Sequence, residues 1–430
     1  MKITSVDIIQ LKWPGLERWW HPVCVRINTA DGQYGYGEAG VAYGTGYLGT
    51  VGVLQELAKR IIGQDALDSN AINRDFYEHT FWAKGGGVIF YSAVSAIDIA
   101  LWDLKGKYFN VPVYQLLGGK VNSTIRAYAS HLEYGWGPFS RYVTTQVEFQ
   151  HLAKRAAEQG YAGVKIDPLP LLKHATYMDH EGMLDTEQLA TIGERVSAVR
   201  QGIGDHRDLI IDCHAKLGLF AAQQLAKAIR DQGILYFEEP FDPQFTGEFQ
   251  QLATCQSIPL ATGERLTTAS SFRPLIEGRA ISVAQPDLGN CGGYSEIAKI
   301  SALAKLHQVK LQLHVCGGPI ATAAALQYEA SDPNCIYHEE HEINLKEANY
   351  QSGKYHYHPV NGTYHIPDIP GIGQELSEQA LKNAKIITIK WTNLPATKNK
   401  MVVGRLYYCW SGCSLISSNA WRCFFWSTWV

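Results

Sequence analysis

Three acidic residues recur at equal intervals in the middle of the chain, each at the end of a short apolar run. Asp212 ends LIID, Glu238 ends LYFE and Glu264 follows IPLATG, so each acid lies 26 residues after the previous one. This interval fits one strand plus one helix, and apolar strands that alternate with helical segments are typical of parallel βα units. A closed barrel of such units brings its strand ends together at one mouth. The repeat therefore predicts three adjacent carboxylates.

Carboxylates that lie this close repel one another unless a cation lies between them. Ligand sets made only of oxygen suit a hard dication such as Mg²⁺. We therefore predict that Asp212, Glu238 and Glu264 bind Mg²⁺. The alternative, three unrelated surface acids, would require their spacing and order to agree by chance.

The same interval continues on both sides of this trio. Downstream, Asp287, His314 and Glu339 each end a further apolar run, and upstream Lys165 and Asp167 close another. Helical patterns, such as those of residues 220–233 and 294–308, lie between the runs. The sequence thus predicts an α/β fold with eight strands, at 124–131, 162–167, 209–214, 235–240, 258–265, 281–287, 309–314 and 335–340. The irregular start of the long segment 168–208 predicts a loop over the barrel mouth.

The first 120 residues predict a separate α+β domain, with strands at 2–11 and 23–38, the latter a hairpin, and helices at 51–62 and 93–107. Two of its loops, 14–22 and 42–49, are rich in aromatic residues. Either these aromatics pack on their own domain, or the loops close the barrel mouth and read the substrate. The second interpretation makes Trp20, His21 and Tyr43 candidate substrate-binding residues.

Composition argues against several classes of function. The net charge of −3 and the pI near 6.6 give no electrostatic case for nucleic acid or a membrane surface. No signal peptide opens the chain, and no apolar run approaches the ~20 residues of a membrane span. The nine scattered cysteines form no CxxC pair, which suits a reducing compartment. We expect a cytoplasmic enzyme with no nucleic-acid or membrane partner.

Two histidines near the trio suggest proton chemistry. A proton next to a carboxylate is weakly acidic, and Mg²⁺ would stabilise the charge that its removal creates. The base needs a pKa near neutrality, which favours histidine. Asp287 could orient His314 and raise its pKa. His214 would share a face with Asp212 if the strand continues, and could protonate a leaving hydroxide. It could also be a bystander, or a nitrogen ligand that favours a transition metal.

Several segments, in this order, resemble the mandelate racemase subgroup of the enolase superfamily, and most closely its acid-sugar dehydratases of the D-galactonate dehydratase type. They span roughly residues 1 to 385. The resemblance implies a capping domain (1–120), a modified TIM (β/α) barrel (121–345) and a return to the capping domain (346–390). The matching segments are SAIDIALWDLKGK, PVYQLLGG, IDCH, FEEP, TGER, QPD, LHVCGGPIA and HEE.

The resemblance also implies functional roles. Asp212, Glu238 and Glu264 would hold Mg²⁺, the Asp287–His314 pair would supply the base, and His214 would be the general acid. Glu339 would hydrogen-bond the enediolate or the substrate carboxylate, although its neighbour Glu340 could take this place. The substrate would be a small-molecule sugar acid, and the protein a homo-oligomer. Glu239 is expected to support the metal ligands rather than to bind metal.

Other activities remain open. Racemases of the subgroup carry Lys-x-Lys on the second strand, whereas this chain reads Lys165-Ile166-Asp167, which counts against that route. Lys165 either forms a buried ion pair or binds the substrate carboxylate. Epimerisation on the same scaffold is one rival, and a metal-dependent barrel hydrolase is a rival of another class. His131 is interpreted as a solvated or packing residue.

The last 40 residues change in character. Residues 391–430 are rich in tryptophan and cysteine and have no clear helix or strand period. If exposed, such a segment promotes aggregation, and its polar interruptions do not favour a membrane anchor. An altered reading frame or a cloning artefact is our leading interpretation, and we assign the segment no function.

Overall fold

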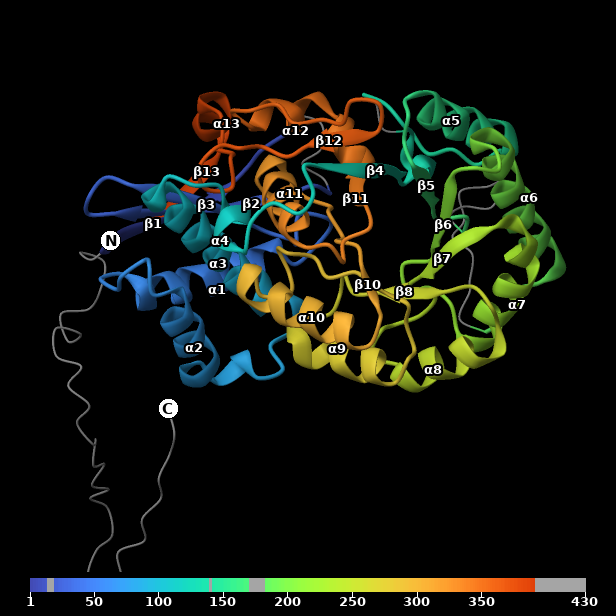
Figure 1. Ribbon diagram of the computed structural model, residues 1–430, viewed down its shortest axis with the longest axis horizontal. Coiled ribbons are helices and arrows are strands. Elements are labelled where there is room, and N and C mark those ends of the chain that lie inside the picture. Colours follow the sequence, from blue (N-terminus) through green and yellow to red (C-terminus); the bar gives the residue numbers. More distant parts are fainter. Residues whose placement is uncertain (14–18, 139–140, 170–181, 391–430) are drawn as a thin grey trace, which may run out of the picture.

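The computed structural model describes residues 1–13, 19–138, 141–169 and 182–390. The chain forms an N-terminal α+β cap beside a barrel of parallel strands and surrounding helices (Figure 1). The tryptophan-rich segment 391–430 and the middle of the predicted mouth loop, 170–181, lie outside the described residues.

The cap contains an antiparallel sheet with strand order β13-β1-β2-β3. The predicted hairpin is confirmed, because β2 and β3 pair antiparallel around a turn in which Gly32 has a φ of 82°. The strands are β1 (Ile3–Gln10), β2 (Val23–Thr29), β3 (Tyr34–Ala39) and β13 (Lys385–Lys390). The cap helices are α1 (Tyr47–Ile61), α2 (Ser69–His79), η1 (Phe81–Ala83), α3 (Gly87–Phe109) and α4 (Val113–Leu116).

The C-terminal strand completes the cap. β13 pairs antiparallel with β1 from Ser5↔Lys390 to Gln10↔Lys385. The cap sheet is therefore built from both ends of the described chain, as the family resemblance implied.

Eight parallel strands of the described chain form the barrel, each next to its sequence neighbour. β11 pairs with β4, and the remaining gap is closed where the Ile336 amide donates to the Leu311 carbonyl at 3.0 Å. The eight predicted strands are confirmed as β4 (Thr124–Ser130), β5 (Gly163–Ile166), β6 (Asp208–Asp212), β7 (Ile234–Glu238), β8 (Leu260–Thr262), β9 (Val283–Ala284), β10 (Lys310–Leu311) and β11 (His338–His341). A short strand, β12 (Thr363–His365), pairs antiparallel with β4.

Helices follow the strands and surround the barrel (Figure 1). The apolar intervals in 220–233 and 294–308 predicted two of them, which appear as α7 and α10. The helices are α5 (Gln146–Glu158), α6 (Thr186–Ile203), α7 (Leu219–Ile229), α8 (Thr246–Cys255), α9 (Thr268–Glu277), α10 (Tyr294–Leu306) and α11 (Pro319–Ser331). Shorter elements are η2 (Leu132–Tyr134), η3 (Arg230–Gln232), η4 (Glu342–Leu345), α12 (Glu347–Ser352) and α13 (Glu378–Asn383).

Helix α3 is the central helix of the cap. By length and composition α3 is apolar enough to cross a membrane, contrary to the expectation that no segment of the chain is. However, 72% of its most apolar stretch is buried inside the protein. Its buried Asp98 accepts hydrogen bonds from Asn73 and Ser295, both at 2.6 Å, which joins α2, α3 and α10. Its buried Asp103 accepts the backbone amides of Tyr36 and Ile372, both at 2.8 Å. The two acids therefore attach α3 to the cap sheet, to the barrel and to the C-terminal segment.

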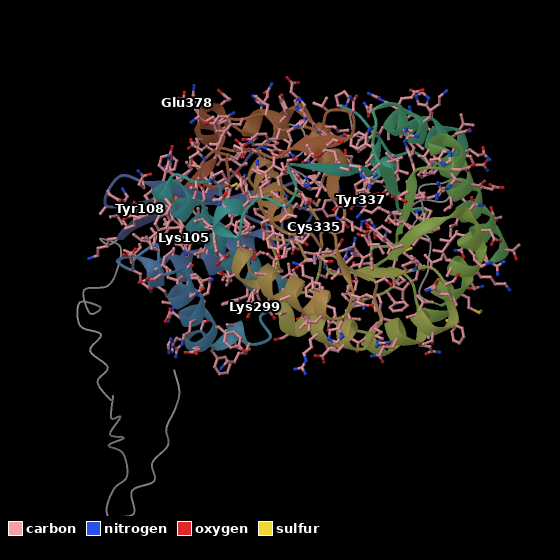
Figure 2. The ribbon with its side chains drawn as sticks, in the orientation of Figure 1. Lys105, Tyr108, Lys299, Cys335, Tyr337 and Glu378 are labelled. Atoms are coloured by element: carbon pink, nitrogen blue, oxygen red, sulfur yellow. The ribbon has the colours of Figure 1, made fainter. Side chains whose placement is uncertain are left out.

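Packed side chains fill the barrel interior. Inward-facing residues of several strands form one buried apolar cluster, in which the Tyr128 and Tyr337 rings lie 6.4 Å apart; Tyr337 is labelled in Figure 2. On β6 and β7, members of this cluster lie two residues before the polar strand-end residues of the mouth, Ile210 before Asp212 and Tyr236 before Glu238. Its members are Tyr128, Ile210, Tyr236, Ala261, Val283 and Tyr337.

Candidate functional site

The predicted acidic trio converges at the carboxyl ends of the barrel strands. Asp212 ends β6 and Glu238 ends β7, and Glu264 follows β8 by two residues. One oxygen of each lies within 4.8 Å of the others. Asp212 and Glu238 are almost fully buried. The sequence prediction that these three carboxylates lie together is therefore confirmed by the geometry.

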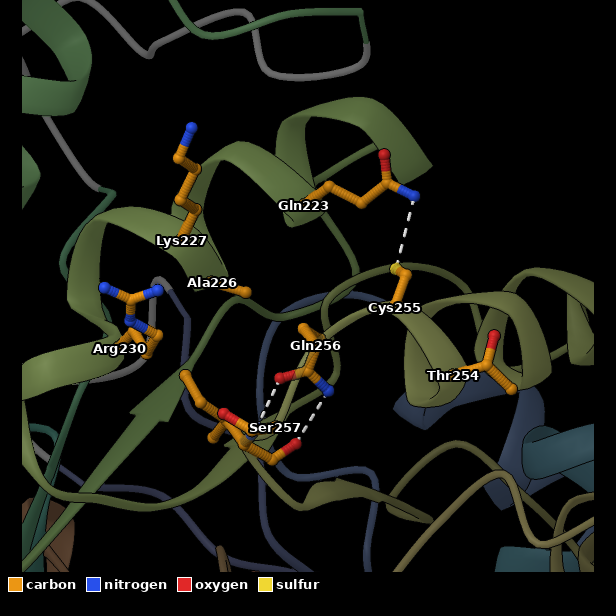
Figure 3. Close-up of a pocket in the computed structure, with 9 residues that line it drawn as sticks. Gln223, Ala226, Lys227, Arg230, Thr254, Cys255, Gln256 and Ser257 are labelled. Carbon is orange, nitrogen blue, oxygen red and sulfur yellow. Dashed lines mark hydrogen bonds between the residues drawn. The ribbon is translucent and has the colours of Figure 1, made fainter.

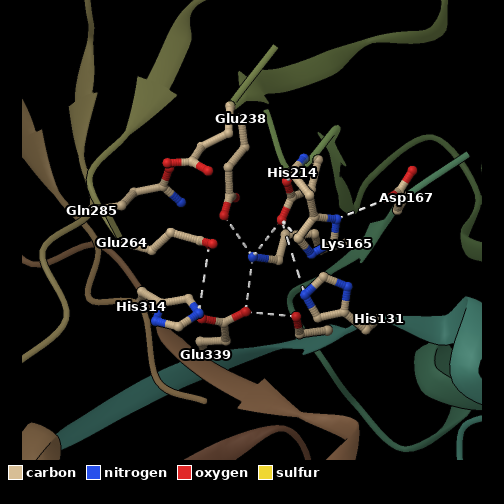
Figure 4. A network of polar contacts seen from close by, with 12 residues as sticks. His131, Lys165, Asp167, His214, Glu238, Glu264, Gln285, His314 and Glu339 are labelled. Carbon is tan, nitrogen blue, oxygen red and sulfur yellow. Dashed lines mark hydrogen bonds and ion pairs between the residues drawn. The ribbon is translucent and has the colours of Figure 1, made fainter. Parts of the chain in front are cut away.

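The Lys165 ammonium lies among these carboxylates (Figure 4). Its Nζ is 2.7 Å from Glu238, 2.8 Å from Glu339 and 3.3 Å from Asp212. Burial alone would lower the pKa of Lys165, but the charges of Glu238 and Glu339 outweigh burial and raise it well above its usual value. Of the two interpretations of Lys165, the structure shows the buried ion pair.

The trio fits a hard dication. Among the described residues, no hydrogen bond reaches Oδ2 of Asp212 or Oε2 of Glu238, although both atoms are buried. Burial and the charge of Asp212 raise the pKa of Glu238 to about 8. A buried cluster of oxygen donors with unused lone pairs is what Mg²⁺ requires, and its charge would relieve the repulsion that raises this pKa.

The predicted Asp287–His314 pair is present. The two residues form a parallel bridge, and Nδ1 of His314 lies 2.7 Å from the Asp287 carboxylate. Nε2 of the ring faces the trio, 3.6 Å from Glu264. Burial lowers the pKa of His314, but the charge of Glu264 and the hydrogen bond to Asp287 outweigh burial and raise it to about 10. A cation bound by Glu264 would offset this charge and bring the pKa back toward neutrality.

His214 reaches the trio by a different route from the one predicted. We expected the strand to continue so that His214 and Asp212 share a face, but β6 ends at Asp212 and His214 has a φ of 48°. The turn still places Nε2 of His214 3.8 Å from Asp212, and Nδ1 lies 2.8 Å from Asp167. Burial lowers the pKa of His214, but the charge of Asp212 and the hydrogen bond to Asp167 raise it to about 9. The ring is therefore held between Asp167 and Asp212, with Nε2 toward the trio.

Glu339, and not Glu340, faces the site. Glu339 accepts the hydroxyl of Ser130 at 2.6 Å and the amide of Val315 at 2.9 Å. Burial disfavours its charge, but Lys165 lowers the pKa of Glu339 well below its usual value, so Glu339 is a carboxylate. Glu340 instead accepts the hydroxyl of Tyr364 at 2.5 Å.

Several polar residues of the site were not identified from the sequence. Arg265 bridges Glu239 and Glu264, and Glu239 also accepts the Thr262 hydroxyl at 3.0 Å. Glu239 thus contacts the partners of the trio, as expected of a supporting residue. Lys216 shares the Asp167 carboxylate with His214.

The interpretation of His131 as solvated or packing is incomplete. Its side chain is 3% exposed and its Nε2 lies 4.0 Å from Asp212. It follows the last residue of β4, so its strand-end position, the same signal that identified the trio, could have revealed it.

The three candidate substrate residues lie in the cap. Trp20 is 1% exposed, stacks on Trp13 with ring centroids 5.7 Å apart, and its backbone bridges that of Tyr43. His21 stacks on Tyr47 at 4.2 Å. Tyr43 is largely exposed. Trp20 is therefore a core residue, which contradicts its prediction as a substrate contact, whereas Tyr43 lies at the surface against Trp19.

A hollow of about 650 Å³ lies away from the trio, between α7 and the residues after α8 (Figure 3). Gln223 donates across it to the Cys255 sulfur at 3.4 Å. Among the described residues, no carboxylate or imidazole lines this hollow.

Comparisons with known proteins agree with this geometry. Residues 20–118 match the N-terminal domain of mandelate racemase and muconate lactonizing enzyme, and residues 148–380 match the enolase C-terminal domain-like family. The chain is 30% identical over 385 residues to a D-gluconate/D-galactonate dehydratase of Picrophilus torridus. The matched region covers 88% of this chain and 93% of that relative.

Two solved structures extend the comparison. A member of the enolase superfamily from Salmonella Typhimurium is 41% identical, with a TM-score of 0.88 over 90% of this chain and 100% of that chain. A mandelate racemase/muconate lactonizing enzyme from Jannaschia sp. CCS1 is 28% identical, with a TM-score of 0.80 over 89% of this chain and 97% of that chain. With its cap, its barrel and both family models in agreement, the chain belongs to the mandelate racemase/muconate lactonizing enzyme group of the enolase superfamily.

Proposed function

We propose that this enzyme is a Mg²⁺-dependent dehydratase that converts a sugar acid, an aldonate or a similar compound, into a 2-keto-3-deoxy acid. The proton at C2 is removed, the hydroxyl at C3 leaves as water, and the resulting enol tautomerises to the keto acid. The family and the dehydratase relative support this class of reaction. Galactonate and gluconate are the first substrates to test, because that relative is named for them.

Asp212, Glu238 and Glu264 would hold the dication, which stabilises the negative charge that forms on the substrate carboxylate when the C2 proton leaves. Lys165 offsets the charge of the carboxylates around it. Glu339 holds that ammonium in place at 2.8 Å. In this proposal both residues act as charged, buried groups.

His314 is the proposed base. Asp287 accepts its Nδ1 proton, which leaves Nε2 free to take the proton from C2. His214 is the proposed acid. The carboxylate of Asp167, which is outside the trio, lies 2.8 Å from Nδ1 of His214 and favours the protonated ring, so Nε2 can give a proton to the departing C3 hydroxyl.

One observation carries the proposal. Two imidazoles flank the trio at different carboxylates, His314 beside Glu264 at 3.6 Å and His214 beside Asp212 at 3.8 Å. Dehydration needs such a base and acid, whereas a barrel hydrolase would leave the Asp287–His314 pair without a role. The cap loops, with His21 and Tyr43, are proposed to contact the substrate hydroxyls, whereas the buried Trp20 supports these loops from the core. We also propose the domain boundaries: residues 1–120 and 346–390 form the cap, and residues 121–345 form the barrel.

The test separates dehydration from proton abstraction. A library of sugar acids is screened with Mg²⁺ for 2-keto acid formation, and the active substrate is incubated with His214→Asn in deuterated water. We expect keto-acid formation to fall by about 10²- to 10⁴-fold, because the general acid is lost. Deuterium exchange at C2 should persist within about tenfold, because His314 remains.

The matched control is His206→Asn, which changes an exposed histidine. Equal loss of both reactions in His214→Asn would contradict the division of roles. Exchange with no keto acid from any substrate in the wild type would favour epimerisation instead.

A further inference from the structure

A second group of metal-binding side chains adjoins the acidic trio. Nε2 of His131 and Nε2 of His214 lie 4.0 Å and 3.8 Å from Oδ2 of Asp212. One ligand atom from each residue lies within 4.8 Å of the others. Figure 4 shows the His131 and His214 rings beside one another. This group differs from the trio because two of its three donors are nitrogen.

Both imidazoles are held in the orientation that a metal ligand needs. Nδ1 of His131 lies 2.8 Å from the Glu133 carboxylate, and Nδ1 of His214 lies 2.8 Å from Asp167. The two rings stack with centroids 4.9 Å apart and an interplanar angle of 26°. A carboxylate that accepts the Nδ1 proton of a histidine fixes its tautomer and leaves Nε2 as a lone-pair donor. Both His131 and His214 have such a carboxylate partner, and both direct Nε2 toward Oδ2 of Asp212.

The third donor has an unused lone pair. Asp212 is fully buried, its Oδ1 accepts the His214 amide at 2.9 Å, and within the described chain its Oδ2 accepts no hydrogen bond. The nearest cation to that oxygen is Lys165, at 3.3 Å. That ammonium offsets part of the charge of Oδ2 but forms no hydrogen bond with it, so a lone pair of this oxygen remains for a further cation.

We propose that His131, His214 and Asp212 form a second cation site, which selects a borderline divalent ion such as Zn²⁺ over Mg²⁺. Imidazole nitrogen suits zinc, whereas the oxygen-only trio suits magnesium. Tetrahedral zinc with bonds of about 2.0–2.1 Å spaces its ligands roughly 3.3 Å apart. Both imidazole-to-carboxylate distances therefore need to shorten by only about 0.5–0.7 Å, which small side-chain rotations supply.

The two sites share Asp212, so zinc and the proposed chemistry are coupled. Zinc on Nε2 of His214 occupies the atom that would donate the proton to the leaving hydroxyl. This consequence, inhibition of the dehydratase by zinc, rests on the proposed function. The binding itself does not, so the binding test uses no sugar acid.

Zinc binding to the full chain is measured by equilibrium dialysis in buffer that contains saturating Mg²⁺. We expect one zinc ion per chain for the wild type. His131→Asn should weaken zinc binding by about 10- to 100-fold, the range that follows from the loss of one ligand or its support. Asparagine is a suitable replacement because His131 has a φ of 65°, a conformation that asparagine tolerates well.

Two variants locate the zinc. Glu264→Gln changes a trio residue that is not a proposed zinc ligand, so zinc affinity should stay at the wild-type value or rise, because weaker Mg²⁺ binding leaves the shared Asp212 more available. His341→Asn is the matched control, because its ring lies 4.7 Å from that of His131 but is not among the proposed ligands. Its zinc affinity should equal that of the wild type. A zinc-soaked crystal should show its anomalous peak between His131 and His214.

Other results would overturn the proposal. These are no zinc bound in the presence of Mg²⁺, equal zinc affinity in His131→Asn and wild type, or zinc lost in Glu264→Gln but kept in His131→Asn. The last result would place zinc in the trio. If His131→Asn does not fold, Glu133→Gln replaces it, because it keeps the His131 ring but weakens the group that orients it. Its zinc affinity should fall several-fold, and an unchanged affinity would overturn the proposal equally.

Discussion

At the scale of single residues, the barrel mouth is organised around one buried ammonium group. Lys165 contacts Asp212, Glu238 and Glu339 and is fully buried. The sequence allowed two interpretations of this lysine, because nothing in its local sequence shows how many carboxylates surround it. Those contacts make Lys165 a competitor of any dication that binds the trio.

Lys165→Met tests this competition. Without added Mg²⁺ the free energy of unfolding should fall by about 3–5 kcal/mol, because the variant leaves buried carboxylates without their partner. Added Mg²⁺ should recover a large part of this loss, since the dication replaces the missing charge. Both values come from chemical denaturation with and without Mg²⁺. Lys216→Met is the control, because Lys216 pairs with Asp167 outside the trio. Added Mg²⁺ should therefore not recover the stability that this variant loses. Equal destabilisation of Lys165→Met under both conditions would contradict the prediction.

At the scale of elements, one buried acid joins the cap to the barrel. Glu38, on β3, accepts the amides of Gly318 at 2.5 Å and Ala321 at 3.0 Å, at the start of α11. Burial raises the pKa of Glu38 to about 7, although these amides partly offset burial. The helix N-terminus favours a negative charge there, but desolvation is the larger effect.

This raised pKa predicts a pH-dependent stability. Between about pH 4.5 and 7 the folded state keeps the Glu38 proton while the unfolded state has lost it, so stability falls as pH rises through this window. Across this pH window, the free energy of unfolding of the wild type should fall by at most about 3 kcal/mol relative to that of Glu38→Gln, since one pKa unit corresponds to about 1.36 kcal/mol. Chemical denaturation of both proteins at pH 4.5, 6 and 8 gives the difference. A difference that does not vary with pH would show that Glu38 is ionised throughout.

At the scale of the whole molecule, the cap depends on a strand from the far end of the chain. β13 forms a six-residue ladder with β1, and its last residue, Lys390, is also the last described residue. A chain that stops at residue 390 keeps every contact reported above.

Two truncations test this arrangement. Removal of residues 391–430 should leave turnover and the thermal midpoint unchanged, in line with our interpretation of that segment. Removal of residues 385–430 should destabilise the cap, because β1 loses the ladder on one side and becomes an exposed edge. Thermal unfolding and turnover of both proteins are compared with those of the full chain. Loss of activity in the folded 1–390 protein would show that the C-terminal segment has a function.

Much of the barrel and part of the site were predictable because they depend on repeats within the sequence. The strand-end positions of Asp212, Glu238 and Glu264 follow from the length of a βα unit, and the Asp287–His314 pair follows from adjacent strands. His131 could have been recognised by the same argument. Arg265 and Lys216 could not, because their partners are set by turns that no repeat describes.

The spacing along the chain was enough to predict the eight-stranded order and the meeting of oxygen donors at one mouth, because parallel strands joined by helices place successive strand ends on one side. Which side chains share a proton or a cation depends instead on contacts made in the folded protein. His214 follows the strand through a turn of positive φ and still reaches Asp212, and Glu339 rather than Glu340 faces the site. These outcomes depend on close packing between residues distant in sequence, which spacing along the chain does not encode.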